Sequence, residues 1–319
     1  MGLLVAFLLF LLLPIRALPW GQKGHETIAA LAQTMLSNSV LAKVQAILHT
    51  NEMASVALWA DQARQLMKYH TGPLTNSAEA KAFILAHPDN ADWHFVDLPL
   101  KTSHYDYTSR FATNSDVVHT LTNCIAVLEG KPGSITTTQA LRYLIHLAGD
   151  IHQPLHVACG YYVPDGTSAK LLRNPTGIIN TEAHDRGANR LIWVTGHSTN
   201  NLHAYWDDHM VTAVDASFGN KEMTNILLGA IANNRKKWKT KNDYHGWPAL
   251  WAEDAVKQAK GVYKGVNLQS AIFDPKGIPK EITIILAPNY DSKHTPIATD
   301  QLAKAAFHLA ELLNQINWQ

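Results

Sequence analysis

The stretch "HLAGDIHQPLH", residues 146 to 156, most constrains how this chain can fold. His146 and Asp150 are four residues apart, so on a continuous helix the two side chains project from one face, one turn apart. Pro154 should end that helix, and the turned chain can then bring His156 back to the same place. The stretch predicts either a set of hydrogen-bonded polar residues near a helix end or a metal site.

His152 lies in the same stretch but off the face that His146 and Asp150 share, because each residue turns a helix by about 100°. We expect it to support the structure or the ligands without binding metal itself.

A second pair, His203 and Asp207 in "NLHAYWDDH", repeats the four-residue spacing. Single candidates are Asp61 in "LWADQAR" and His94 in "ADWHFVD". The alternative for each is a hydrogen-bonded structural residue, which is the common state of a buried polar group.

The segment "WGQKGHETIAA" places Trp20 and His25 at the expected mature N-terminus, where a freed amine can itself bind metal. The tryptophans in these segments, such as Trp59, Trp93 and Trp206, are expected to lie in the core or to line the site.

The overall charge excludes non-specific attraction of nucleic acid by a cationic surface. The chain has 27 Lys and Arg against 26 Asp and Glu, a formal net charge of +1. A nucleic-acid partner therefore needs a local positive site. Histidine, the commonest metal ligand, occurs 17 times.

The N-terminus carries an apolar run from Leu3 to Leu13, too short to span a bilayer and typical of a secretory signal peptide. We therefore predict a signal peptide at residues 1–19, a mature domain at 20–319 and an exported protein, secreted or periplasmic. A membrane-tethered mature form is the alternative. Cys124 and Cys159 are the only cysteines, and either one disulfide or two buried thiols fits an exported protein.

Apolar spacing of three and four residues predicts an all-α fold. The segments 160–180 and 265–297 are rich in Pro, Gly, Asn and Asp and are expected to be long ordered loops. No linker or repeat divides the chain, so one domain is expected. The expected helices cover about 23–48, 53–69, 78–87, 116–129, 137–152, 199–213, 222–238, 249–262 and 299–316.

Six motifs in this order resemble one family: "WGxxGH", "WAD", "WHFVD", "HLxGDxHQPLH", "DRGxN" and "NLHxxWD". They are similar to those of the zinc-dependent, single-strand-specific nucleases of the mung bean nuclease type, the S-one/P-one nuclease family. The resemblance implies a single mostly helical domain with a trinuclear zinc cleft, related in architecture to zinc-dependent phospholipase C.

The resemblance also implies the ligands of three Zn²⁺ ions per chain. Asp150 would bridge two of the ions, and His152 has no metal in this scheme. Nitrogen and oxygen donors without thiolate suit hydrolytic zinc with open positions. The first zinc would bind Asp61, His94, His146 and Asp150; the second His156, His203 and Asp207; and the third the Trp20 amine and carbonyl, His25 and Asp150.

The same resemblance implies residues that act on the substrate. Arg64, one turn after Asp61, would contact the scissile phosphate, and these two residues with Asp150 form the implied catalytic set. Phe95 would stack an unpaired base and Asp97 would hydrogen-bond its edge. Asn189 is a candidate polar substrate contact. Ala188 stands where the family usually has a second glycine.

The resemblance implies hydrolysis of single-stranded DNA and RNA to 5′-phosphate products, with 3′-nucleotidase activity on 3′-nucleotides. A monomer without a stable protein partner and without a membrane span in its mature form is expected. Two alternatives remain. One is a zinc-dependent phospholipase C, whose last ligand is glutamate where this chain has Asp207. The other is a zinc-binding protein without catalysis.

Overall fold

The computed structural model describes residues 20–319 apart from 173, 175–176, 196–197 and 217–221. The predicted signal peptide, residues 1–19, lies outside the described residues.

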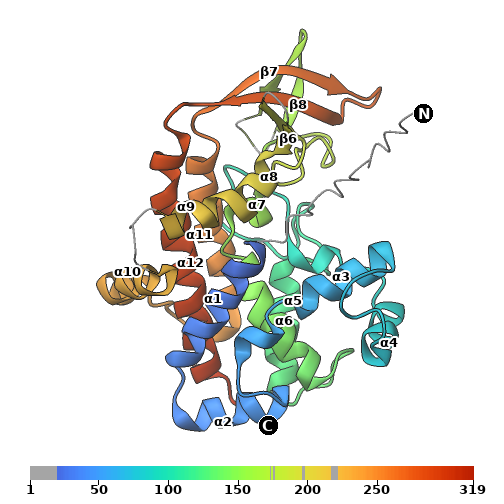
Figure 1. Cartoon of the computed structure of the whole chain (residues 1–319). Helices are drawn as coiled ribbons and strands as arrows, with labels where there is room; N and C mark the ends of the chain where they lie inside the picture. The colour runs from blue at the N-terminus through green and yellow to red at the C-terminus, as the bar shows by residue number, and fades with distance from the viewer. Residues whose placement is uncertain (1–19, 173, 175–176, 196–197, 217–221) are drawn as a thin grey trace, which may run out of the picture.

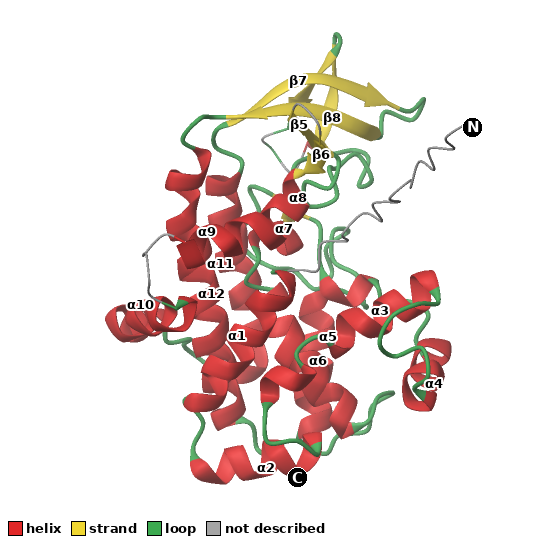
Figure 2. Ribbon diagram, viewed as in Figure 1, coloured by secondary structure: helices red, strands yellow, loops and turns green. Residues whose placement is uncertain are grey.

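The fold is mostly helical, as the sequence predicted, with small sheets at one end (Figures 1 and 2). The α-helices are α1 (Gly21–Thr34), α2 (Asn38–Leu48), α3 (Trp59–Tyr69), α4 (Ala78–Ala86), α5 (Val117–Leu128), α6 (Thr137–Asp150), α7 (Pro154–Val157), α8 (Leu202–Ala204), α9 (Met210–Ala216), α10 (Met223–Trp238), α11 (Trp247–Val262) and α12 (Tyr290–Gln315). Short 3₁₀ segments are η1 (Met53–Val56), η2 (Asp92–His94) and η5 (Tyr244–Gly246), and η4 (Tyr205–His209) is a π-helix.

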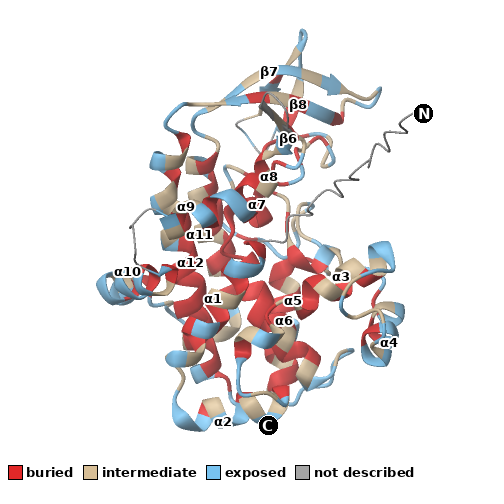
Figure 3. Ribbon diagram, viewed as in Figure 1, coloured by how far each residue is buried: buried red, intermediate tan, exposed pale blue. Residues whose placement is uncertain are grey.

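Helix α12 is the central element of the core. Its side chains are almost all buried between Ala298 and Leu313, and it contacts α1, α6, α9, α10 and α11. The burial colours of Figure 3 show the same: the inner helices are buried and the outer surfaces of α2, α4 and α10 are exposed. An apolar helix of this kind has to be enclosed by others to be stable in water.

Helix α6 packs against α5 and carries the ligand face into the core. Its start is fixed by a capping box: Gln139 N donates to Thr136 Oγ1 at 3.2 Å, and Thr136 N donates to Gln139 Oε1 at 3.0 Å. Pro154 begins the short helix α7, so the chain turns between Ile151 and Gln153 as the sequence predicted.

The strands form two hairpin-based sheets and one short pair, beside α7 and α8 in Figure 2. Strands β5 and β8 are parallel, whereas β5–β6 and β7–β8 are antiparallel. The strands are β1 (Leu98–Pro99), β2 (Ala158–Cys159), β3 (Tyr162–Asp165), β4 (Ser168–Leu171), β5 (Leu191–Thr195), β6 (Ser198–Asn201), β7 (Val266–Phe273) and β8 (Pro279–Leu286).

The prediction of long loops was wrong in two places. Residues 160–180 contain the β3–β4 hairpin, and 265–297 contain the β7–β8 hairpin followed by the first turns of α12. Strand β7 is "VNLQSAIF", in which half-buried and exposed residues alternate except at Gln269 and Ser270, which are both exposed. Its Asn, Gln and Ser content masked this irregular alternation. Pro296 lies inside α12 as its seventh residue, beyond the first turn, so the helix lacks one backbone N–H donor at that position.

Three predicted helices are also interrupted, and one of them, 53–69, forms the 3₁₀ segment η1 and then α3. Residues 23–48 form α1 and α2 because Ser37 begins a new helix: its Oγ accepts the Val40 N–H at 3.4 Å. Residues 199–213 begin with the end of β6 and pass through α8 and η4 before α9. Cys124 and Cys159 are buried free thiols, so the disulfide alternative is not found.

In the part of the chain that the structure describes, no helix is both long and apolar enough to cross a membrane.

We expect Thr136→Ala to lower the free energy of unfolding by about 1 kcal/mol, because the α6 N-terminus loses its capping hydroxyl. Urea denaturation followed by circular dichroism measures the change. Thr137→Ala is the matched control, since Thr137 is exposed and lies at the next position in the helix. Equal stability of the two variants would show that the capping box does not anchor α6.

Candidate metal centre

Eight buried or nearly buried imidazole and carboxylate side chains converge where α1, α3, α6 and α7 meet η2, α8 and η4. They are His25, Asp61, His94, His146, Asp150, His156, His203 and Asp207, all of which the sequence analysis singled out as candidate ligands. Three groups among them have ligand atoms within 4.8 Å of one another: His25, Asp61 and His146; His94, His146 and Asp150; and His156, His203 and Asp207.

Asp150, at the end of α6, is the common neighbour of four histidines. Its Oδ2 lies 2.9 Å from His94 Nδ1 and 3.2 Å from His146 Nε2. Its Oδ1 lies 3.4 Å from both His25 Nε2 and His156 Nδ1. One carboxylate therefore touches side chains from α1, η2, α6 and α7.

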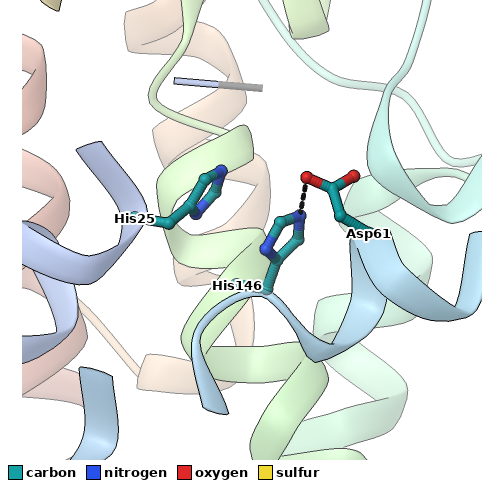
Figure 4. A group of neighbouring side chains, drawn as sticks. All are labelled: His25, Asp61 and His146. Carbon is teal, nitrogen blue, oxygen red and sulfur yellow. Dashed lines mark ion pairs between the residues drawn. The ribbon is translucent and has the colours of Figure 1, made fainter. Parts of the chain in front are cut away.

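Figure 4 shows His25 and Asp61 on opposite sides of His146. The His25 and His146 rings stack with centroids 4.0 Å apart, and His146 Nε2 lies 3.8 Å from Asp61 Oδ2. Trp20 lies next to these side chains and contacts two other parts of the centre. Its backbone N donates to Asp207 Oδ1 at 3.3 Å, and its indole Nε1 donates to the Gly149 carbonyl at 3.0 Å.

His203 and Asp207 form the second side of the centre with His156. His203 Nε2 lies 3.3 Å from Asp207 Oδ2, and His156 Nε2 lies 3.7 Å from Asp207 Oδ1. Asp207 lies in the π-helix η4, a rare conformation that often occurs at functional sites.

Backbone carbonyls fix the protonation of three of these histidines. Nδ1–H of His146 donates to Ala57 O at 2.7 Å, that of His203 to Gly187 O at 2.7 Å, and that of His156 to His94 O at 3.2 Å. In a neutral imidazole the lone pair is then on Nε2, which is the side that faces the carboxylates. This is the arrangement that metal-ligating histidines have in proteins.

When these three histidines are neutral, their Nε2 lone pairs face carboxylate oxygens, so acceptor atoms face acceptor atoms unless a proton or a metal cation lies between them. Among the described residues, the buried side-chain atoms without a hydrogen bond include Nε2 of His94, His146 and His156, Asp150 Oδ1 and both ring nitrogens of His25. Buried polar atoms normally have hydrogen-bond partners, so several unpartnered atoms in one place indicate a cation-binding site. The residues fit a divalent metal with nitrogen and oxygen ligands.

The pKa values reflect the same crowding. Burial, with the charge of Arg64, lowers the pKa of His94 to about 4. Burial acts to lower the pKa of His146 as well, but the Asp150 and Asp61 carboxylates outweigh it and raise the value to about 9. Burial would raise the pKa of Asp150, yet His146 and His156 hold it well below its usual range. Asp150 is therefore ionised and available to bridge cations.

Arg64 lies at the solvent edge of the centre. Its Nη2 is 2.6 Å from Asp61 Oδ1, and its side chain is 22% exposed while that of Asp61 is buried. A guanidinium in this position can hold a ligating carboxylate and still present N–H groups to an anion that enters the site.

The three predicted substrate residues lie in two segments beside the centre. Phe95 follows His94 directly and is half-buried. Asp97 lies near His184, with Oδ2 at 3.5 Å from Nδ1 of that residue. Asn189 is exposed, and its side chain donates to Arg186 O at 2.8 Å, so in this conformation it stabilises its own loop.

Three supporting residues were missed by the sequence analysis. Gly149 lets His25 approach α6, because a Cβ there would lie 2.7 Å from the His25 ring. Gln153 Nε2 donates to Asp207 Oδ1 at 2.8 Å. Asp185 accepts from Ala188 N at 2.8 Å and from Gly160 N at 3.2 Å. Gly149 and Gln153 lie within "GDIHQPLH", so their position next to the candidate ligands in the sequence could have indicated their supporting role.

The loop after Asp185 is strained where it supports His203. Arg186, Gly187 and Ala188 all have positive φ values, of 57°, 57° and 65°. A Cβ on Gly187 would lie 2.1 Å from Leu155 O. Ala188 thus adopts the left-handed backbone without being glycine, which costs about 1–2 kcal/mol. The hydrogen bonds to Asp185 hold the loop in place, and Gly187 O can then accept from His203.

His152 is directed away from the ligands, as its position on the helix predicted. Its Nδ1–H donates to Ala148 O at 2.7 Å, and its Nε2 lies 2.7 Å from His308 Nδ1. It joins the end of α6 to α12.

Clusters of ligating side chains that could hold more than one divalent ion are found in metal-dependent phosphoester hydrolases. The sequence profile of the S1/P1 nuclease family matches residues 20–317, so the chain belongs to that family and is a phosphodiester-hydrolysing nuclease.

The relatives in this family are distant but similar over nearly their whole length. Nuclease S1 of Aspergillus oryzae is 24% identical over 93% of this chain and 91% of its own. Nuclease P1 of Penicillium citrinum is 25% identical over 93% and 98%, and Endonuclease 2 of Arabidopsis thaliana is 24% identical over 93% and 90%.

We expect Zn²⁺ to raise the melting temperature of protein that has been stripped with a chelator, because a cation that binds the folded state stabilises it by mass action. Differential scanning fluorimetry measures the shift. Asp150→Asn should abolish most of it, since the bridging charge is lost. Asp215→Asn, which changes a surface partner of Lys23, is the control and should keep it. A melting temperature insensitive to Zn²⁺ would contradict the metal assignment.

Proposed function

We propose that this protein is an exported zinc-dependent endonuclease that cleaves single-stranded DNA and RNA to 5′-phosphate products and also removes the phosphate of 3′-nucleotides. The observation that supports this most is the set of buried acceptor atoms around Asp150, together with membership of the S1/P1 nuclease family.

Only the second proposed ligand set is identical to one of the three groups of neighbouring side chains. The first adds Asp61 to the group of His94, His146 and Asp150. The third rests on the 3.4 Å distance from His25 Nε2 to Asp150 Oδ1 and on the family resemblance. Zn²⁺ at these groups would supply Lewis acidity and a water of lowered pKa. We assign three ions: the first to Asp61, His94, His146 and Asp150; the second to His156, His203 and Asp207; and the third to Trp20, His25 and Asp150.

The chain's own side chains orient the substrate. Arg64 presents its guanidinium at the solvent edge, where it can bind the non-bridging oxygens of a phosphodiester and stabilise their growing negative charge. Phe95 offers an aromatic face to an unpaired base, and Asp97 offers a carboxylate to the N–H groups on its edge. A base in a duplex is stacked and paired, so this mode of binding favours single strands.

The third ion requires a free amine at Trp20, so the proposal includes removal of residues 1–19 on export. The Trp20 backbone N already lies 3.3 Å from Asp207 Oδ1, beside the other ligands. Mass determination of the N-terminus of the exported protein tests this step, and a mature chain that begins at any other residue would contradict the third ligand set.

Purified zinc-loaded protein should cut single-stranded DNA and RNA faster than duplex DNA. The expected products carry 5′-phosphates, which end labelling after phosphatase treatment detects, and 3′-nucleotides should release phosphate. No cleavage by protein that contains its full complement of zinc would contradict the proposal. Release of phosphocholine from phosphatidylcholine without nucleolysis would instead favour a phospholipase C.

Arg64→Ala should lower kcat for single-stranded DNA by about 100-fold, the usual order for loss of one donor to the developing charge. Metal content measured by mass spectrometry should stay unchanged, because Arg64 is not a ligand. Lys236→Ala, which removes an exposed charge of α10 on the other side of the molecule in Figure 1, is the control. Equal kcat values for these two variants would exclude the role proposed for Arg64.

A further inference from the structure

A fourth group of potential ligands lies outside the centre described above. Asp97, Cys159 and His184 place a carboxylate oxygen, a thiol sulfur and an imidazole nitrogen within 4.8 Å of one another. None of the three is among the nine zinc ligands proposed above.

Backbone pairing brings these residues together. Strands β1 and β2 run parallel, with Leu98 opposite Ala158 and Pro99 opposite Cys159. An isolated antiparallel bridge between Tyr161 and His184 adds the third side chain. The three ligand atoms are therefore positioned by the backbone and not only by flexible side chains.

The contacts within the group again bring acceptors together. His184 Nδ1 accepts the Arg186 backbone N–H at 3.2 Å, so this nitrogen carries a lone pair, and a metal ion bound there would replace the hydrogen bond. Asp97 Oδ2 lies only 3.5 Å from the same atom. Cys159 Sγ has a weak contact of 3.8 Å with Leu98 O. Two acceptors and a thiol at this spacing suit a cation with a ligand sphere of mixed nitrogen, oxygen and sulfur.

The surrounding charge also favours a cation. Asp185 lies close enough for its carboxylate to act on Asp97 and His184, and its own side chain is buried. Burial raises the pKa of the Cys159 thiol well above its usual range, and Asp97 and Asp185 add to this effect. Arg190 is engaged with the carbonyl oxygen of His184 at 2.6 Å. A divalent ion would balance one carboxylate and one thiolate.

The group is accessible from solvent on one side only. The side chains of Asp97 and His184 are 23% and 14% exposed, whereas Cys159 is fully buried. Three protein ligands with one solvent-facing position is the arrangement of an exchangeable zinc site, in contrast to a closed structural one.

We propose that Asp97, Cys159 and His184 form an additional site for a thiophilic divalent cation, Zn²⁺ or Cd²⁺. Binding converts the Cys159 thiol to a metal thiolate and releases its proton to solvent. The bound ion occupies the Asp97 carboxylate, so excess metal inhibits cleavage by competing with the base. This inhibitory consequence rests on the proposed function, whereas the binding site itself does not.

Cadmium titration of the zinc-loaded protein tests the site directly. Cd²⁺ bound to a thiolate has an ultraviolet charge-transfer band, and the nine proposed zinc ligands include no sulfur. We expect the band to appear and to saturate at one equivalent. Cys159→Ala and Cys159→Ser should remove it, and Cys124→Ala, which changes the other buried thiol, should keep it. Asp97→Asn or His184→Ala should weaken Cd²⁺ binding by about 100-fold.

No band, or a band that persists without Cys159, would overturn the site. Circular dichroism of both Cys159 variants ensures that a lost band does not reflect a lost fold. In the activity assay, excess Zn²⁺ should inhibit cleavage by the wild-type protein and by Cys124→Ala but not by Cys159→Ala. A protein that shows the band but cleaves no nucleic acid would refute the proposed function and leave the site standing. A protein that cleaves nucleic acid but shows no charge-transfer band would refute the additional site and leave the proposed function standing.

Discussion

The placement of the Asp150 carboxylate against four imidazoles is the constraint on which the rest of the structure depends. His25, His94, His146 and His156 come from four different elements, and each has a ring nitrogen within 3.4 Å of one of its oxygens. Burying so many polar groups is costly unless each is paired. A divalent cation can bind the lone pairs of the carboxylate oxygens and of the imidazole nitrogens at the same time. Metal binding and the folding of this centre are therefore expected to be coupled.

The supporting structure serves to hold these lone pairs in place. The carbonyl oxygens of Ala57, His94 and Gly187 each accept a hydrogen bond from the Nδ1–H of a candidate ligand histidine. The Nε2 lone pair of each of these histidines is then free to bind a metal ion. The Gly187 carbonyl is in position only because the loop after Asp185 adopts three successive left-handed residues. The protein therefore accepts local backbone strain in the loop that orients His203, as is common at functional sites.

The spacing of residues in the sequence predicted which ligands of this centre share a helix. It could not predict which ligands come together from distant parts of the chain. His146 and Asp150 share a face because of helix geometry, which any four-residue spacing reveals. Asp61 and His94 gave no such signal alone, since their distance from Asp150 depends on how α3 and η2 pack against α6; only the resemblance to a family connected them. The β7–β8 hairpin was missed because Asn, Gln and Ser in β7 weaken its alternation and some exposed positions, such as Ile272, are apolar. The π-helix at Asp207 was missed because i, i+4 spacing also fits a regular helix.

The same backbone frame carries both the proposed zinc ligands and the fourth group. Val96 N donates to His156 O at 2.8 Å, immediately before β1 and β2 pair. His94 precedes Asp97 by three residues, and His156 precedes Cys159 by three, so each of two parallel segments supplies a ligand to the centre and then one to the additional group. The separation between the two groups is thus fixed by paired backbone. If the Asp97 carboxylate hydrogen-bonds the base of a substrate nucleotide, the same pairing would hold that carboxylate at a constant distance from the metal ions that act on the phosphate of the nucleotide.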